Sequence, residues 1–234
     1  ELCDKSFLVD CGEGVQITMR QLGVKTARLY TVFISHLHGD HCFGLIGLIS
    51  TLGMMNRTQP LHIYAHADLE KLLRPMLDYH CQDLPYELVF HAINPRKREV
   101  IWEDRTLTIE SIPLKHKVPT CGFLFTEKHR GQEPRKRYAY CSDTMYREQI
   151  VEQIAGVDVL YHEATYTEKD LDKCKKHTHS TAKQAATIAQ KAGVGKLVIG
   201  HFSAREDDHN VFLEEAKEVF ENTVLAIERT SIDL

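Results

Sequence analysis

The sequence predicts an α/β layered fold, because strand-like and helix-like segments alternate along its 234 residues. Short apolar runs bounded by polar residues, glycine or proline recur throughout the chain, and such runs are typical of buried strands. Between several of them, the apolar residues recur at the spacing of one helix face. With 43% hydrophobic residues, a chain of this length can bury one sizeable core. We therefore expect a single domain over residues 1–234.

The predicted strands precede most of the side chains that could carry chemistry. They span 7–10, 29–35, 61–64, 86–91, 107–114, 121–126, 137–142, 157–162, 196–200 and 224–227. Helical spacing is clearest at 45–54, 68–78, 181–192 and 210–220. Asp68 and Ser180 are the expected N-caps of two of these helices, since both side chains can accept a backbone hydrogen bond. Candidate functional residues gather at strand ends and not within helices.

Targeting and redox signals favour a cytoplasmic protein. The chain contains no run of about 18 apolar residues that could span a membrane, and its N-terminal region lacks the pattern of a signal peptide. It has seven cysteines, an odd number, and no CxxC pair that would indicate a structural zinc site. Reduced thiols in a cytosol-like compartment fit this usage, and no membrane partner is expected.

The net charge of -4 argues against a globally basic nucleic-acid-binding protein, because binding to phosphates needs lysine and arginine. Any contact with RNA must therefore use local basic clusters. The candidates are 128–130, 135–137 and 173–176. Runs of charge are more often solvated surface, so these clusters permit RNA binding without indicating it.

A dense cluster of metal-binding side chains lies at the end of the predicted strand 29–35. The sequence SHLHGDH brings His36, His38, Asp40 and His41 into one loop. Imidazole and carboxylate groups both suit zinc, and a short loop can direct alternate side chains toward two neighbouring ions. A chance origin of this pattern is improbable in a chain of this composition. The sequence therefore predicts a metal site here.

One loop cannot complete two metal sites, so further ligands must come from other strand ends. His116, Asp143 and His201 each lie just beyond a predicted strand. A single histidine or aspartate at such a position is more often structural or merely exposed. Three of them, added to the SHLHGDH loop, favour a shared metal centre.

The SHLHGDH loop resembles the signature of the metallo-β-lactamase superfamily, and the segment 10–14, DCGEG, matches the first motif of its ribonuclease Z branch. The resemblance implies an αβ/βα sandwich of four layers, in which two packed mixed sheets are flanked by helices. It also implies two zinc ions per chain. One zinc would be held by His36, His38 and His116, the other by Asp40, His41 and His201, with Asp143 bridging the two.

Two further motifs favour the ribonuclease Z branch over related hydrolases. The segments 162–165, HEAT, and 179–181, HST, resemble motifs of that branch. The resemblance implies that His179 is the general acid at the leaving oxygen, that Glu163 orients its imidazole, and that Asp40 acts on the nucleophile as well as on zinc. His162 is equally compatible with a structural role. No site role is expected for His62, His66, His80, His91, His129, His177 and His209.

The segment 200–205, GHFSAR, resembles the last motif of the family. The resemblance implies that Arg205 binds a substrate phosphate, which a guanidinium can contact through two hydrogen bonds. The alternative is a surface ion pair with Glu206 or Asp207.

Taken together, these motifs imply a zinc-dependent endoribonuclease that removes the 3′ trailer from precursor tRNA. It would leave a 3′-hydroxyl on the tRNA and a 5′-phosphate on the trailer, and would act as a homodimer. One alternative is a related dizinc phosphodiesterase or arylsulfatase acting on a small ester, which needs the same ligands. A metal-bearing but inactive RNA-binding subunit is another, although the complete ligand set argues against it.

Two segments typical of ribonuclease Z are expected to be missing. In the family, a long arm that grips tRNA lies between the strands that correspond here to 121–126 and 137–142. Only residues 126–136 span that interval in this chain. An N-terminal stretch carrying the first strands is also expected to be absent. Both differences bear on tRNA binding and leave the metal chemistry unchanged.

Overall fold

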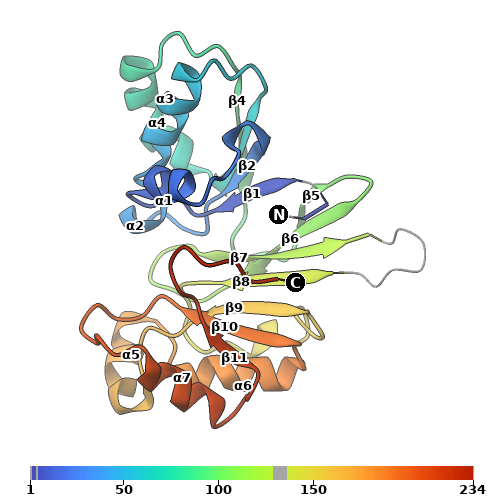
Figure 1. Cartoon of the computed structure of the whole chain (residues 1–234), viewed down its shortest axis with the longest axis vertical. Helices are drawn as coiled ribbons and strands as arrows, with labels where there is room; N and C mark the ends of the chain where they lie inside the picture. The colour runs from blue at the N-terminus through green and yellow to red at the C-terminus, as the bar shows by residue number, and fades with distance from the viewer. Residues whose placement is uncertain (1, 4, 129–135, 234) are drawn as a thin grey trace. The chain divides into compact units, whose positions relative to one another are not determined.

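The computed structural model describes residues 2–3, 5–128 and 136–233, and its contacts group the chain into two compact units, Glu1–Asn94 and Pro95–Leu234. Each unit contains one β-sheet with helices, as the α/β prediction requires (Figure 1). No helix in the described part of the chain is both long and apolar enough to cross a membrane. The expectation of a single domain stays a prediction.

Unit 1 is built on a parallel sheet. Its strands are β1 (Ser6–Val9), β2 (Leu29–Phe33), β3 (Leu61–His66) and β4 (Leu88–Ile93), in that order across the sheet. Its helices are α1 (Val15–Gln21), α2 (Gly39–Cys42), α3 (Leu45–Met54) and α4 (Asp68–His80), with a 3-10 turn η1 (Thr26–Arg28). Parallel strands bring their carboxyl ends to one edge of a sheet, and the SHLHGDH loop leaves that edge after β2.

The core of unit 1 lies between this sheet and helices α3 and α4. Alternate residues of β3, Leu61 and Ile63, are fully buried there, as are Leu48 on α3 and Leu69 on α4. Burying a side chain of this kind stabilises the fold by about 1.5–3 kcal/mol. Because β2 lies beside β3, this core also fixes the end of β2 from which the SHLHGDH loop starts.

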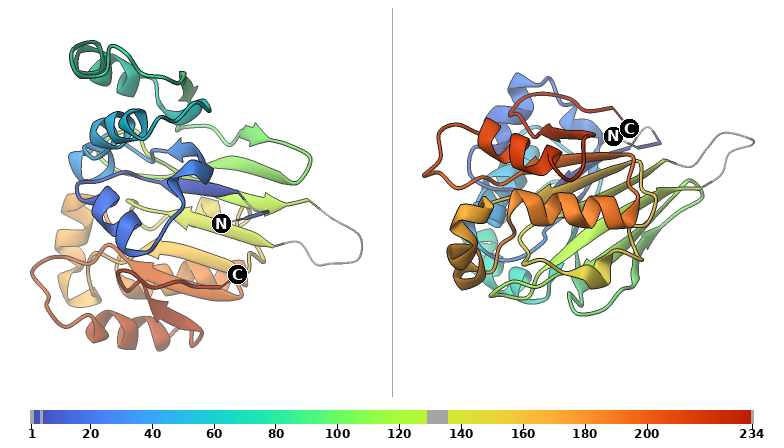
Figure 2. Two further views of the ribbon diagram at one scale, coloured as in Figure 1. Left: turned by 45° about the horizontal axis from the view of Figure 1, so that its top comes forward. Right: turned by 90° about the horizontal axis from the view of Figure 1, so that it is seen from below.

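Unit 2 is built on a mixed sheet. Its described strands are β5 (Val100–Glu103), β6 (Leu107–Pro113), β7 (Cys121–Glu127), β8 (Arg137–Cys141), β9 (Val159–Glu163), β10 (Lys196–Gly200) and β11 (Thr223–Leu225). They are ordered β11-β10-β9-β8-β7-β6-β5 across the sheet. The helical segments are η2 (Glu148–Ile150), η3 (Glu168–Asp170), α5 (Leu171–His177), α6 (Ala182–Ala192) and α7 (Asn210–Lys217), with α6 lying along β9 and β10 (Figure 2).

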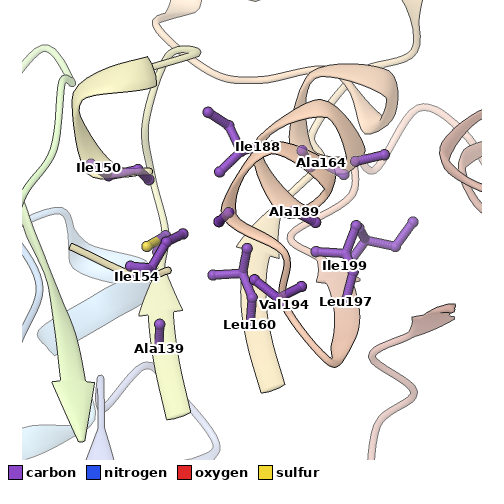
Figure 3. Close-up of a cluster of buried hydrophobic side chains, with 14 of the residues drawn as sticks. Ala139, Ile150, Ile154, Leu160, Ala164, Ile188, Ala189, Val194, Leu197 and Ile199 are labelled. Carbon is purple, nitrogen blue, oxygen red and sulfur yellow. The ribbon is translucent and has the colours of Figure 1, made fainter. Parts of the chain in front are cut away.

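Small residues on α6 allow the helix to lie close to this sheet. Ala185 and Ala189 of α6 are fully buried in one core cluster with Leu160, Leu197 and Ile199. Figure 3 shows Ala189 beside these residues of β9 and β10. Interiors are close-packed, so a larger side chain at either alanine would force this helix away from the strands. The packing therefore fixes the ends of β9 and β10, where Glu163 and His201 lie.

Every predicted strand and helix is present, with ends shifted by a few residues. The elements that the sequence analysis missed are short or carry weak signals. Helix α1, VQITMRQ, contains β-branched residues that disfavour helix, and β5 is a four-residue strand at the sheet edge. Helices α2 and α5 span one and two turns and lack an apolar stripe long enough to recognise.

Both predicted N-caps are wrong by one residue. Helix α6 is capped by Thr181, whose hydroxyl accepts from the Gln184 amide in a capping box, while the Ser180 hydroxyl donates to the Thr144 carbonyl. Helix α4 already includes Asp68, and its carboxylate accepts a hydrogen bond from Lys71 at 2.8 Å. In both cases another hydrogen bond engages the side chain expected to cap the helix.

Candidate metal centre and catalytic pair

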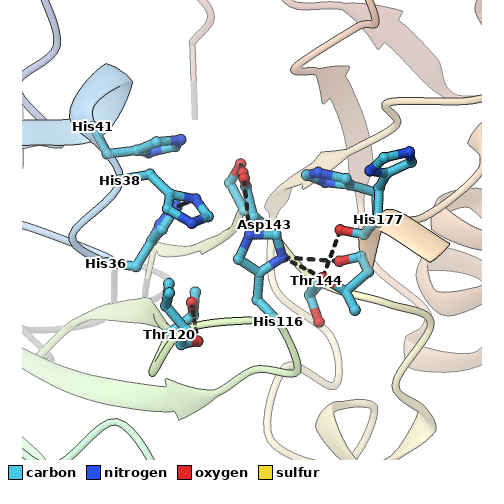
Figure 4. A network of polar contacts seen from close by, with 12 residues as sticks. His36, His38, His41, His116, Thr120, Asp143, Thr144 and His177 are labelled. Carbon is cyan, nitrogen blue, oxygen red and sulfur yellow. Dashed lines mark hydrogen bonds and ion pairs between the residues drawn. The ribbon is translucent and has the colours of Figure 1, made fainter. Parts of the chain in front are cut away.

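The SHLHGDH loop of unit 1 brings imidazole nitrogens together. His36 is fully buried, and its Nε2 lies 3.0 Å from Nδ1 of His38 (Figure 4). Two nitrogens bound to one tetrahedral zinc at about 2.0–2.1 Å lie roughly 3.3 Å apart, so this spacing fits two ligands of one ion. The Ser35 hydroxyl lies 3.0 Å from Nδ1 of His36 and so orients its ring.

Asp10 holds the third histidine of this loop. Its Oδ2 lies 2.8 Å from Nδ1 of His41, and its two oxygens also accept hydrogen bonds from the amide and hydroxyl of Ser35. The Nε2 atom of His41 then lies 3.5 Å from Oδ2 of Asp40. A carboxylate that fixes an imidazole in this way is a common support for a metal ligand. The sequence analysis gave Asp10 no role of its own, although it opens the DCGEG motif.

Gly12, in the same motif, permits the close approach of the two loops. A Cβ atom at Gly12 would lie 2.1 Å from the backbone carbonyl of Asp40. The Cys11 amide donates to the His41 carbonyl at 2.7 Å, which joins the loops directly. Any side chain at position 12 would therefore displace Asp40 or His41.

In unit 2, four candidate residues meet because of strand direction. Strands β6, β8, β9 and β10 all run the same way, since β6 and β8 are each antiparallel to β7 while β8, β9 and β10 are mutually parallel. Their carboxyl ends therefore share one edge of the sheet. His116, Asp143, Glu163 and His201 lie at these ends.

Asp143 offers one oxygen to each of two imidazoles. Its Oδ1 lies 3.2 Å from Nε2 of His201. Its Oδ2 lies 3.8 Å from Nε2 of His116, and both of these residues are labelled in Figure 4. The carboxylate is almost fully buried, and the Ser142 hydroxyl donates to Oδ1 at 2.8 Å. This arrangement can place one carboxylate oxygen on each of two neighbouring metal ions.

Thr178 orients His116 from the loop between α5 and α6. Nδ1 of His116 lies 3.0 Å from the Thr178 carbonyl oxygen and 2.9 Å from its hydroxyl, so Nε2 faces Asp143. Thr178 adopts a left-handed backbone conformation with φ of 63°, which is uncommon outside glycine. The sequence analysis missed this contact, because a backbone carbonyl carries no residue-type signal.

Glu163 is a fully buried carboxylate that holds His179. Its Oε1 lies 2.8 Å from Nδ1 of His179 and accepts from the Thr144 amide, while Oε2 accepts from the Ser180 amide and from the amide and hydroxyl of Thr165. Burial raises the pKa of Glu163, but the bond and charge of His179 outweigh it and lower the pKa to about 2. Burial lowers the pKa of His179, but the hydrogen bond and the negative charge of Glu163 stabilise the protonated imidazole more strongly. The pKa of His179 is therefore raised.

His179 lies beside the candidate ligands of unit 2. Ligand atoms of Asp143, His179 and His201 all lie within 4.8 Å of one another. The rings of His116 and His179 have centroids 5.0 Å apart. With Nδ1 turned toward Glu163, the other nitrogen of His179 is the one that can donate a proton to a bound group.

Replacing Glu163 by glutamine should change the acid stability of the protein. A carboxylate whose pKa falls from 4.5 unfolded to about 2 folded stabilises the protein above pH 4.5, and this contribution is lost as the pH falls toward 2. Over that window, the free energy of unfolding of the unsubstituted protein should drop by on the order of 3 kcal/mol more than that of Glu163→Gln. Urea unfolding at stepped pH measures both. Equal pH dependence in the two proteins would contradict the buried-carboxylate assignment.

Four further histidines were considered in the sequence, and only His162 among them was a possible site residue. His162 is fully buried, its Nδ1 contacts the Glu163 carbonyl at 2.7 Å, and its Nε2 finds no hydrogen-bond partner among the described residues. Its structural role stays a prediction. His62 and His91 contact each other at 2.9 Å on β3 and β4. His129 lies outside the described residues.

Arg205 lines a cavity of about 300 Å³ within unit 2. Tyr166 and Lys173 lie on the same cavity wall. Glu206 pairs with Lys169 at 3.3 Å, and no ion pair of Arg205 is found in the part of the chain that the structure describes. The sequence left open an ion pair between Arg205 and Glu206. In the structure, Lys169 forms the ion pair with Glu206 instead.

Comparison with known proteins places this geometry in a family. Residues 5–202 match the family model described as the β-lactamase superfamily domain. A protein named ribonuclease Z from Bacteroides fragilis (strain YCH46) is 46% identical over 276 residues, covering 100% of this chain and 91% of that protein. Another from Phocaeicola vulgatus is 45% identical over 274 residues, covering 99% and 89%.

A solved structure agrees with these relatives. The crystal structure of human tRNase Z, short form, superposes with a TM-score of 0.83 at 27% identity, covering 100% of this chain and 90% of that chain. The predicted metallo-β-lactamase fold is confirmed, and its histidine and aspartate clusters are those of a metal-binding protein.

The expected absence of the arm stays a prediction. The alignment with the Bacteroides fragilis protein covers 276 positions and all 234 residues of this chain, so at least 42 positions have no counterpart here. The interval expected to lack the arm, 126–136, contains residues 129–135, which lie outside the described residues. The Glu127 amide donates to the Lys136 carbonyl at 2.9 Å, at the base of that interval.

Proposed function

Because this chain belongs to the ribonuclease Z family of the metallo-β-lactamase superfamily, we propose that it removes the 3′ trailer from precursor tRNA. The products would be a tRNA ending in a 3′-hydroxyl and a trailer beginning with a 5′-phosphate. The observation that carries the proposal is the Glu163–His179 pair at 2.8 Å, placed beside Asp143 and His201. A hydrolase that must expel an alkoxide needs such an acid next to its metal ligands.

We propose that two zinc ions are bound. One would be held by His36, His38 and His116, the other by Asp40, His41 and His201, and Asp143 would contribute one oxygen to each. The nitrogen and oxygen donors suit zinc, and within each unit the spacing of ring nitrogens and carboxylate oxygens fits shared ions. Zinc supplies Lewis acidity at such a site, which lowers the pKa of water and stabilises charge on a phosphoryl oxygen.

The residues of the chain then supply the proton transfers. Asp40, whose side chain is 68% exposed, can orient the attacking water and accept its proton. His179 donates a proton to the departing 3′ oxygen of the tRNA. Glu163 keeps Nδ1 of His179 protonated and turns the other nitrogen toward the substrate.

We further propose that Arg205 binds a phosphate of the RNA. Its place on the 300 Å³ cavity beside Lys173 and Tyr166, without an ion pair in the described part of the chain, supports this role. The basic clusters contribute unevenly: Lys128 pairs with Glu103, and Lys173 pairs with Asp170 at 2.7 Å. Salt-bridged lysines contribute less to phosphate binding, whereas no ion pair engages Arg205 in the described part of the chain.

The homodimer and the cytoplasmic location are also proposals. A groove of about 640 Å³ in unit 1 is lined by Ile17, Val24, Met54 and Met55, all of which are exposed apolar side chains. Apolar surface of this kind commonly marks a protein interface.

No disulfide joins the seven cysteines, all of which lie in the described residues, and this supports a reducing compartment. We also propose that the two units act as one functional domain, since the family model spans both.

Cleavage of a 3′-extended precursor tRNA, measured beside hydrolysis of bis(p-nitrophenyl) phosphate, tests the proposed function. We expect a cut directly after the discriminator base, lost in Asp143→Ala. Hydrolysis of the small ester without cleavage of tRNA would reject this function in favour of a small-ester phosphodiesterase. Binding of tRNA without hydrolysis of either substrate would favour the inactive RNA-binding subunit.

A further inference from the structure

We propose that Thr165 is a positioning residue that fixes the tautomer of His201, so that His201 presents Nε2 to a metal ion. The proposal rests on the proposed metal-binding role of His201. Thr165 is the last residue of the HEAT segment and has a polar side chain. The sequence analysis named no role for it.

The Thr165 hydroxyl lies between a carboxylate and an imidazole. Its Oγ1 is 2.7 Å from Oε2 of Glu163 and 2.9 Å from Nδ1 of His201. A hydroxyl has a single proton, and an ionised carboxylate can only accept. The hydroxyl must therefore donate to Glu163 and accept from Nδ1–H of His201. The proton of His201 is held on Nδ1, and its Nε2 keeps the lone pair that a metal ion needs.

The direction of Nε2 agrees with this assignment. Nε2 of His201 lies 3.2 Å from Oδ1 of Asp143, the carboxylate proposed to contact both ions. His201 itself has a left-handed backbone with φ of 60°, a conformation that a non-glycine residue keeps only when its surroundings hold it. The hydrogen bond from Thr165 is one of the contacts that can hold it.

Thr165 is itself held firmly. It is 7% exposed, its amide donates to Oε2 of Glu163, and its carbonyl accepts from the Ser203 amide at 3.1 Å. The β-branched side chain restricts rotation about χ1, which reduces the loss of entropy on fixing the hydroxyl. The same carboxylate thus organises two groups: it contacts His179 directly and His201 through Thr165.

The chain offers a matched set of variants. Thr165→Val keeps the shape and removes the hydroxyl, whereas Thr165→Ser keeps the hydroxyl. Thr167→Val is the control, because Thr167 is also buried and its hydroxyl has no hydrogen-bond partner among the described residues. Thr165→Ala gives a second variant without a hydroxyl, and circular dichroism checks that each protein is folded.

Two measurements on the zinc-loaded full chain test the proposal. The first is the affinity for zinc, by competition with a chelator. We expect Thr165→Val and Thr165→Ala to weaken it by about 10- to 100-fold, as loss of a partner behind a metal ligand commonly does. Thr165→Ser and Thr167→Val should stay close to the unsubstituted protein. The second is the NMR signal of the His201 Nδ1 proton, which should exchange faster with solvent only in the variants without the hydroxyl.

The outcomes separate this proposal from the proposed function. Unchanged zinc affinity and proton exchange in folded Thr165→Val would overturn it, as would a Thr165→Ser variant as impaired as Thr165→Val. His201→Ala is measured in parallel, and unchanged zinc affinity there would reject the metal role of His201 and this proposal with it. Neither measurement uses tRNA, so failure to cleave tRNA would count only against the proposed substrate.

Discussion

Replacing His179 by alanine is expected to lower the rate of precursor tRNA cleavage by about 10²- to 10⁴-fold, the usual contribution of a general acid. The departing 3′ oxygen is a poor leaving group unless it receives a proton, and His179 is the imidazole placed for this by Glu163. The loss should fall on kcat, because the proton is transferred in the transition state. Single-turnover cleavage of a 3′-extended precursor tRNA measures it.

Three comparisons isolate the role of the proton. Zinc content of His179→Ala should stay close to that of the unsubstituted protein, and loss of metal would contradict the assignment. Hydrolysis of bis(p-nitrophenyl) phosphate should be much less affected, because p-nitrophenolate leaves without a proton. His177→Ala, at the last residue of α5 and two positions before His179, serves as the matched control and should cleave tRNA normally.

The pH dependence of kcat gives a further check on the same residue. In the proposed mechanism the acid form of His179 is the active one, and the contact with Glu163 raises its pKa above 6.5. Activity should therefore persist above pH 6.5 and decline only at the raised pKa. An alkaline decline centred at or below pH 6.5 would contradict the role assigned to Glu163.

Replacing Asp143 by alanine is expected to have the larger effect on metal binding. One carboxylate faces both His116 and His201, so the substitution would remove the oxygen donor proposed for both ions. Losing a partner behind a ligand already weakens metal binding by about 10- to 100-fold, and losing a ligand should exceed that range. Cleavage of tRNA and of bis(p-nitrophenyl) phosphate should fall together. Zinc content by elemental analysis and zinc affinity by competition with a chelator measure the effect.

Asp172→Ala provides the matched control for this substitution, because Asp172 lies exposed on α5 of the same unit. It should bind zinc and cleave tRNA as the unsubstituted protein does. An Asp143→Ala protein that keeps two zinc ions per chain, or that hydrolyses the small ester at the normal rate, would show that Asp143 is not a shared ligand.

The sequence by itself predicted every described strand except β5, four main helices and the family of this protein. These features can be recognised from short segments of the sequence. Apolar runs indicate the strands, and the motifs SHLHGDH, HEAT and HST each consist of a few consecutive residues. The direction of each strand also follows once the fold is recognised, and that direction brings Asp143, Glu163 and His201 to one edge. The assignment of the metal ligands themselves stays a prediction.

Only the tertiary structure decided how the candidate residues are held. Asp10 contacts His41 across 31 residues, Thr178 contacts His116 across 62, and Thr165 reaches His201 across 36. Contacts over such separations depend on how strands and loops pack, which no local pattern encodes. One of these contacts uses a backbone carbonyl, a group that every residue has. Helices α1 and α5 were missed because seven residues are too few for an apolar stripe to be recognised, and α1 also contains β-branched residues that disfavour helix.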